Sequence, residues 1–170
     1  EQRGLAPGNA GVVRVGDYDN DGDLDLLTAP RGGRGLQLQM NRGDGVFALD
    51  QRPEALLEGA ETLIIHDAAF ADFDNDGWLD IVLVGESEDG GAGVIRLFRS
   101  SASGRFDDLS DLVPGDLPPL RRLALADFGD DGDLDLFVSA VDGSTRLIRN
   151  DGGNANRYLK MQLVGLSTGS

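Results

Sequence analysis

The most informative part of this sequence is the nine-residue stretch Asp17-Tyr18-Asp19-Asn20-Asp21-Gly22-Asp23-Leu24-Asp25. It returns as Asp72-Phe73-Asp74-Asn75-Asp76-Gly77-Trp78-Leu79-Asp80 and again as Asp127-Phe128-Gly129-Asp130-Asp131-Gly132-Asp133-Leu134-Asp135. The first aspartates stand at 17, 72 and 127, so both intervals are 55 residues. A pattern D-x-D-x-D-G-x-x-D kept at one fixed spacing indicates an internal repeat. We number the nine positions of each acidic loop from 1 to 9.

Short apolar segments surround each loop, and turn residues rich in Gly and Ser separate them. In the second copy these segments are 64–70, 81–84, 94–98 and 105–106. The matching segments of the other copies are 11–15, 26–28, 36–40, 46–48, and then 123–125, 136–138, 145–148 and 158–164. Such spacing is typical of all-β proteins, and four strands in a repeat of about 50 residues is the size of a propeller blade.

We therefore predict an all-β fold, a β-propeller-type array of three four-stranded antiparallel blades. The array is expected to form a single domain over residues 1–170, with blades at approximately 9–62, 63–118 and 119–165. Position 2 of each loop is aromatic, and position 8 is always Leu. We expect the position-8 leucines to anchor the loops to the core.

The loops carry the chemistry of a calcium site. Ligands that are all oxygen suit a hard cation, Ca²⁺ first among them. Positions 1, 3 and 5 offer carboxylates, Gly at position 6 permits a sharp turn, position 7 offers its backbone carbonyl and position 9 closes the site. The predicted metal ligands are Asp17, Asp19, Asp21, Asp23, Asp25, Asp72, Asp74, Asp76, Trp78, Asp80, Asp127, Asp131, Asp133 and Asp135.

Two other interpretations of the loops are disfavoured. An EF-hand needs a Glu at position 12 and flanking helices, whereas position 12 here is Thr28, Leu83 or Val138 inside an expected strand. A solvated acidic turn without an ion would leave converging carboxylates to repel one another. In the third loop Gly129 replaces the second carboxylate, and we expect Asp130 beside it to point away. We predict two complete Ca²⁺ sites and a weaker third, completed by water or left empty.

The composition argues against several classes of partner and function. The net charge is −15, and 14 of the 30 acidic residues fall within the 27 residues of the loops. Nucleic acid is therefore not an expected partner, because phosphate binding needs a basic patch. No apolar run is long enough to span a membrane, so we expect no membrane insertion. With His66 as the sole histidine and no cysteine, nucleophilic catalysis has little support and we expect no enzyme.

Two parts of the sequence resemble the FG-GAP/VCBS repeat family, whose integrin α-subunit relatives carry similar Ca²⁺ loops. They are Gly16-Asp17-Tyr18-Asp19-Asn20-Asp21-Gly22-Asp23-Leu24-Asp25-Leu26 and Ala71-Asp72-Phe73-Asp74-Asn75-Asp76-Gly77-Trp78-Leu79-Asp80-Ile81. Asn41-Arg42-Gly43-Asp44-Gly45-Val46-Phe47 is similar to the family's turn before the fourth strand. Residues 150–165 are similar to the segment in which bacterial proteins of the ASPIC/UnbV type pass out of their repeats.

The resemblance implies a β-propeller with Ca²⁺ in the loop between the first two strands of each blade. It implies a secreted, periplasmic or cell-surface (extracellular) location. We accordingly expect a calcium-stabilised, non-enzymatic repeat module with a structural, cell-adhesion or protein-interaction role. The alternative is a carbohydrate-binding, lectin-like propeller or a non-catalytic part of a polysaccharide-active enzyme.

The number of predicted blades is too small for a closed propeller. Closed propellers typically have four to eight blades, whereas this sequence supplies three. An open array would expose apolar faces and strand edges. We expect either a homo-oligomer, a dimer with six blades, or a fragment whose missing blades belong to a longer parent chain. The finished surface is expected to bind a protein or a glycan.

Overall fold

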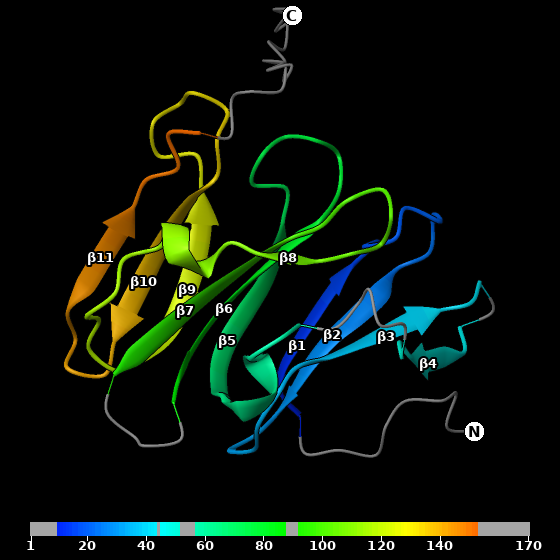
Figure 1. Cartoon of the computed structure of the whole chain (residues 1–170), viewed down its shortest axis with the longest axis horizontal. Helices are drawn as coiled ribbons and strands as arrows, with labels where there is room; N and C mark the ends of the chain where they lie inside the picture. Colours follow the sequence, from blue (N-terminus) through cyan, green and yellow to red (C-terminus); the bar gives the residue numbers. More distant parts are fainter. Residues whose placement is uncertain (1–9, 44, 52–56, 88–91, 153–170) are drawn as a thin grey trace, which may run out of the picture.

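The computed structural model describes residues 10–43, 45–51, 57–87 and 92–152, which form three antiparallel sheets standing side by side (Figure 1). The first sheet has the order β1 (Ala10–Gly16), β2 (Asp25–Pro30), β3 (Gln37–Asn41) and β4 (Phe47–Leu49). The second has the order β5 (Ile64–Ala71), β6 (Asp80–Glu86), β7 (Gly93–Arg99) and β8 (Asp107–Asp108). In the third, β10 (Asp135–Ala140) pairs with both β9 (Leu120–Ala126) and β11 (Thr145–Ile148).

These sheets confirm the prediction of an all-β chain built from blade-like units. Each sheet is a meander in sequence order, because short turns join antiparallel neighbours. None of the three sheets closes on itself in the part of the chain that the structure describes. The fourth strand predicted for the third unit, residues 158–164, lies outside the described residues. The predicted domain limits remain predictions.

The connections between sheets hold little regular structure. Short 3₁₀ helices, η2 (Ala60–Thr62) and η3 (Ser110–Leu112), precede the second and third sheets. Within the described ranges, no helix combines the length and the apolar character needed to cross a membrane.

Each acidic loop joins the first two strands of its sheet in the same register. Gly16 faces Asp25 across the first hairpin, and Ala71 faces Asp80 across the second. In the third hairpin, Ala126 faces Asp135. Position 9 is therefore the first residue of the second strand in all three sheets, and all three loops emerge from the same kind of strand end (Figure 1).

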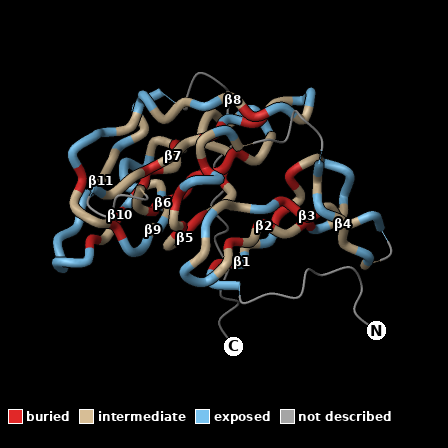
Figure 2. Tube along the Cα trace, turned by 60° about the horizontal axis from the view of Figure 1, so that its bottom comes forward, coloured by how far each residue is buried: buried red, intermediate tan, exposed pale blue. Residues whose placement is uncertain are grey.

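The middle strand of the molecule, β6, is buried on both faces. Successive residues of a strand point to opposite sides, so Ile81 and Leu83 join the core between the first and second sheets. Val82 and Val84 join the core between the second and third sheets. This explains the uninterrupted apolar run of β6, and Figure 2 shows burial concentrated toward the inner strands.

Loop positions 2 and 8 pack between neighbouring sheets. Tyr18, at position 2, stacks on Phe70 of β5, with ring centroids 6.3 Å apart and planes 3° apart. Leu79, at position 8, packs against the same core from the second loop. Position 2 thus points to the following sheet and position 8 to the preceding one. At the two ends of the array these side chains are exposed: Leu24 is 58% exposed and Phe128 is 72% exposed. The expected anchoring of position 8 thus holds for Leu79 but not for Leu24.

A polar contact also crosses all three sheets at their first strands. The guanidinium of Arg14 in β1 pairs with the buried carboxylate of Asp67 in β5. The other oxygen of Asp67 accepts a hydrogen bond from the backbone N–H of Leu123 in β9, at 3.2 Å. Since a buried carboxylate is costly unless it is paired, this contact favours one alignment of the three sheets.

The core of β6 gives a direct test of this packing. Leu83 is fully buried, so Leu83→Ala should lower the free energy of unfolding by ~2–5 kcal/mol, since it removes apolar contacts and leaves a cavity. The same substitution at the exposed Leu112 should change it by less than about 0.5 kcal/mol. Urea denaturation measures both values, and equal losses would contradict the burial of β6 between two sheets.

Candidate metal centre

The three acidic loops share one internal hydrogen-bond scheme. The carboxylate of Asp17 accepts the backbone N–H groups of Asp21, at 3.1 Å, and Gly22, at 3.0 Å. Asp72 and Asp127 accept the corresponding N–H groups in their own loops at 2.9–3.0 Å. The position-5 carboxylate in turn accepts the N–H of position 7 in every loop. The side chains that would bind a cation therefore also shape the loop.

The turn also depends on two left-handed residues. Position 6 has φ values of 90–93° in the three loops, which Gly adopts without steric cost. Position 4 has φ of 56° at Asn20 and Asn75 and 58° at Asp130. Asn and Asp tolerate this region better than other residues do. The third loop therefore keeps the backbone conformation of the others although its position 3 is Gly129.

Two loops bring three carboxylates together. In the first, oxygens of Asp17, Asp19 and Asp21 lie within 4.8 Å of one another, and in the second this holds for Asp72, Asp74 and Asp80. Calcium–oxygen distances are about 2.3–2.6 Å, so oxygens on opposite sides of one Ca²⁺ lie about 5 Å apart. The donor set and its spacing therefore fit a hard cation. Among the described residues the third loop forms no such group.

Position 9 holds a buried carboxylate in all three loops. Asp25 accepts the N–H of Tyr18 at 3.2 Å with one oxygen and the N–H of Asn41 at 2.8 Å with the other. Asp80 makes the same two bonds with Phe73 and Ser100, and Asp135 with Phe128 and Asn150. Each carboxylate thus ties the start of its loop to the end of the third strand.

Burial makes this arrangement electrostatically costly. Desolvation raises the pKa of Asp25 to about 6 and that of Asp80 to about 7, and neighbouring loop carboxylates add to both shifts. Desolvation and the charges of Asp76 and Asp72 likewise raise the pKa of Asp74. At neutral pH these loops therefore gain from a bound cation, which favours the ionised carboxylates.

The third loop behaves differently. The pKa of Asp135 is lowered, chiefly by the hydrogen bond from the N–H of Asn150, with further contributions from Phe128 and from the charge of Arg149. Here the donors outweigh the desolvation of a carboxylate that is as buried as its counterparts.

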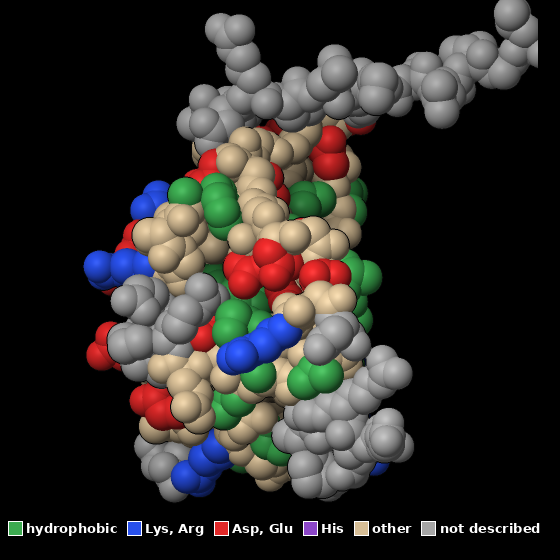
Figure 3. Space-filling model, turned by 90° about the vertical axis from the view of Figure 1, so that its right-hand side faces the viewer, with side chains coloured by type: hydrophobic (Ala, Val, Ile, Leu, Met, Phe, Trp, Pro, Cys, Tyr) green, Lys and Arg blue, Asp and Glu red, His purple; other side chains and the backbone are tan. Residues whose placement is uncertain are grey.

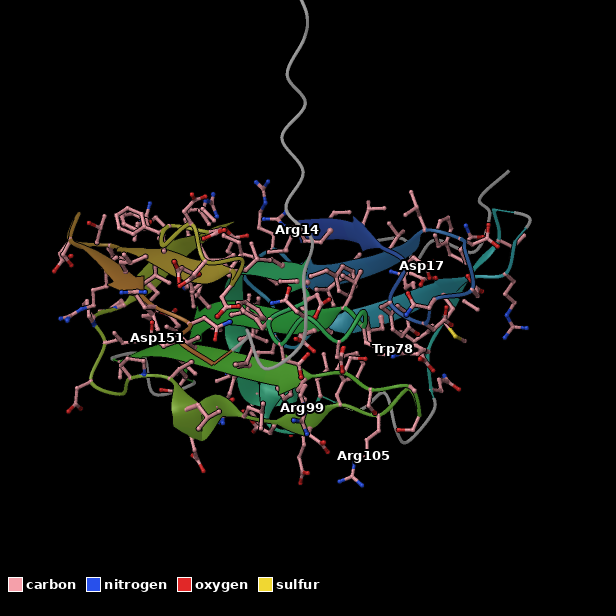
Figure 4. The ribbon with its side chains drawn as sticks, turned by 90° about the horizontal axis from the view of Figure 1, so that it is seen from above. Arg14, Asp17, Trp78, Arg99, Arg105 and Asp151 are labelled. Carbon is pink, nitrogen blue, oxygen red and sulfur yellow. The ribbon has the colours of Figure 1, made fainter. Side chains whose placement is uncertain are left out.

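The remaining candidate ligands lie within the loops as the sequence places them. Position 7 (Asp23, Trp78 and Asp133) donates its N–H to position 5, and the bond from Trp78 to Asp76 is 2.9 Å. Trp78 is half-buried at the rim of the second loop, on the same side as Asp17 (Figure 4). Whether positions 5, 7 and 9 complete the coordination in each loop remains a prediction, as does the weaker third site.

Sequence reasoning missed that neighbouring loops are joined to each other. The side-chain amide of Asn20 donates to the carbonyl of Gly77 in the second loop at 3.0 Å. Asn75 donates in the same way to the third loop, reaching the Asp133 carboxylate at 3.2 Å. The repeated Asn at position 4 was the available signal, but only the spacing between sheets shows that its amide reaches the next loop.

The raised pKa values predict how the metal-free protein responds to pH. Asp25 and Asp80 bind protons more tightly in the folded chain than in the unfolded chain. Their protonation stabilises the fold fully below the unfolded pKa near 3.8, and this stabilisation is lost as the pH rises through about 6 and about 7. In EDTA, carboxyl ¹³C NMR titration should place the two midpoints there.

Asp135 is the matched control for this titration, because the same position in the third loop should titrate below 3.8. A midpoint of Asp80 near that of Asp135 would contradict the prediction.

Comparison with protein-family models matches an FG-GAP-like repeat at residues 17–83 and again at 72–138. Each match begins at position 1 of an acidic loop and ends in the second strand of the following sheet. A search of curated proteins gives no match. The two matches together cover residues 17–138, more than half of the chain, and the chain therefore belongs to the FG-GAP-like repeat family.

Proposed function

We propose that this protein is a calcium-stabilised, non-enzymatic β-propeller repeat module with a structural, adhesion or protein-interaction role. The observation that carries the proposal is the convergence of Asp17, Asp19 and Asp21 in one loop and of Asp72, Asp74 and Asp80 in the next. The atoms that these side chains offer are all carboxylate oxygens, which suit Ca²⁺. They lie in a chain whose net charge is −15. Figure 3 shows a group of acidic side chains near the middle of one face of the molecule.

The loop hydrogen bonds explain how Ca²⁺ would act on stability. The cation offsets the repulsion among loop carboxylates, and position 9 links each loop to the third strand of its sheet. A ligand that binds only the folded chain raises the free energy of unfolding by about 2.7 kcal/mol per site when its concentration is a hundred times its Kd. Extracellular calcium modules commonly have Kd values of about 10⁻⁴–10⁻³ M. We therefore propose a secreted, periplasmic or cell-surface location, where such sites would be occupied.

The ends of the array support a proposal for its partner. The first end face carries Val13, Val15 and Leu24, and the third end face carries Phe128 and Phe137, all exposed. In the internal contacts, the position-2 aromatics Tyr18 and Phe73 pack forward, and the position-8 residue Leu79 packs backward. Within the described ranges, Phe128 and Leu24 have no neighbouring sheet to contact and are exposed. The first end face of one copy can therefore pack against the third end face of another. Two copies joined in this way at both ends would give six blades.

Calcium should stabilise the protein strongly. We expect Ca²⁺ to raise the melting temperature relative to EDTA, and the fluorescence of Trp78, the sole tryptophan, to change during a Ca²⁺ titration because it lies in the second loop. Asp74→Asn removes one ligand of that loop and should abolish the Trp78 response and about half of the gain in stability. Asp116→Asn makes the same change of charge in an exposed turn and should leave both intact. A melting temperature that EDTA does not change would refute calcium stabilisation.

The end faces make a separate prediction about assembly. Light scattering in Ca²⁺ should give the mass of a dimer, and Phe128→Glu should give a monomer, because a charge cannot be buried unpaired in an apolar contact. Leu112→Glu is the control, since Leu112 is equally exposed and lies outside both end faces. A wild-type monomer would refute the dimer and favour further repeats in a longer chain as the partner.

A further inference from the structure

In the third acidic loop, the position-5 carboxylate lies close to Gly129, which stands where the other loops have Asp. A Cβ added at Gly129, where the other loops have Asp, would lie 2.8 Å from Oδ2 of Asp131 and 3.1 Å from its Cγ. The Asp131 carboxylate therefore occupies the space in which a position-3 side chain would begin. Its other oxygen, Oδ1, still accepts the N–H of Asp133 at 3.2 Å, as position 5 does in the other loops. The third loop thus keeps the backbone hydrogen bonds of the other loops, and one oxygen of Asp131 lies beside the place of the absent position-3 side chain.

A guanidinium lies beside that oxygen. Nη2 of Arg149 is 3.5 Å from Oδ2 of Asp131 and 3.0 Å from Oδ1 of Asp151. Arg149 directly precedes Asn150, whose N–H binds the position-9 carboxylate of the third loop. The equivalent residues of the first and second sheets are Met40 and Arg99, which precede Asn41 and Ser100.

Arg99, the equivalent arginine of the second sheet, also acts on its own acidic loop, because its charge opposes the rise in the pKa of Asp74. Its ion pair, however, is with Asp107 of β8, at 3.2 Å. The first sheet has the uncharged Met40 at the equivalent position. Among the described residues, the ion pair between an arginine and a position-5 carboxylate lies in the loop that lacks a carboxylate at position 3.

We propose that Arg149 is the built-in cation of the third acidic loop. Its guanidinium neutralises Asp131 in place of a metal ion, so this loop folds without Ca²⁺ while the first and second loops depend on it. The calcium dependence of the other loops rests on the proposed function, whereas the pairing of Arg149 with the third loop does not. One calcium-independent unit would keep part of the array folded when calcium is scarce.

The first test is made in EDTA, where no loop holds calcium. Arg149→Gln should speed amide hydrogen exchange in residues 127–135 about two- to fivefold, a modest effect because the Arg149 side chain is 52% exposed and an exposed ion pair is weak. Arg146→Gln removes the same charge from β11, the strand that ends just before Arg149, and should leave exchange in this loop unchanged. Equal exchange in the two variants would overturn the proposal.

The second test asks whether the guanidinium and a metal ion exclude each other. Calorimetric titration of the wild type with Ca²⁺ should give two equivalents, and the double variant Gly129→Asp/Arg149→Gln should give three, because it restores the position-3 carboxylate and removes the internal cation. A wild type that binds three equivalents, or a double variant that still binds two, would overturn the proposal. A wild type that binds no Ca²⁺ would refute the proposed function, while the EDTA experiment would still decide the role of Arg149.

Discussion

The buried carboxylate at position 9 is the contact on which the rest of the structure depends. In each sheet it begins the second strand, and its two oxygens accept one N–H from the start of the acidic loop and one from the end of the third strand. Three segments are therefore joined through a single side chain. Burying these carboxylates is costly because their negative charge loses its hydration. This desolvation raises the pKa of Asp25 and Asp80. The acidic loop is thus part of the fold of each sheet and not an appendage to it.

The loops also determine how one sheet follows another. Position 2 packs forward, position 8 packs backward, and the position-4 amide crosses to the next loop. The same nine residues shape the turn, present the carboxylates and contact both neighbours. A cation bound in one loop would therefore act on the contact with the next sheet as well.

Much of this was open to prediction from the sequence. The alternating apolar segments predicted the strands, and the repeated loop predicted two carboxylate clusters, because both signals depend on residues close together in the chain. The uninterrupted run of β6 is another local signal, and it reflects burial on both faces. Two outcomes escaped prediction. Leu24 was expected to anchor its loop, but the described chain has no sheet in front of the first one for it to contact. The amides of Asn20 and Asn75 reach neighbouring loops 57 or 58 residues away, a distance that local patterns do not encode.

The sequence by itself determined the all-β repeat, its three acidic loops and the carboxylates that suit a hard cation, because these follow from residue type and spacing within nine residues. Only the tertiary structure decided which charges meet. Arg99 and Arg149 each directly precede the residue whose N–H binds the position-9 carboxylate, yet Arg99 forms its ion pair with β8 and Arg149 with its acidic loop. In the third loop, Asp131 lies in the space that a side chain at position 129 would enter. Such a choice depends on the space that side chains leave in three dimensions.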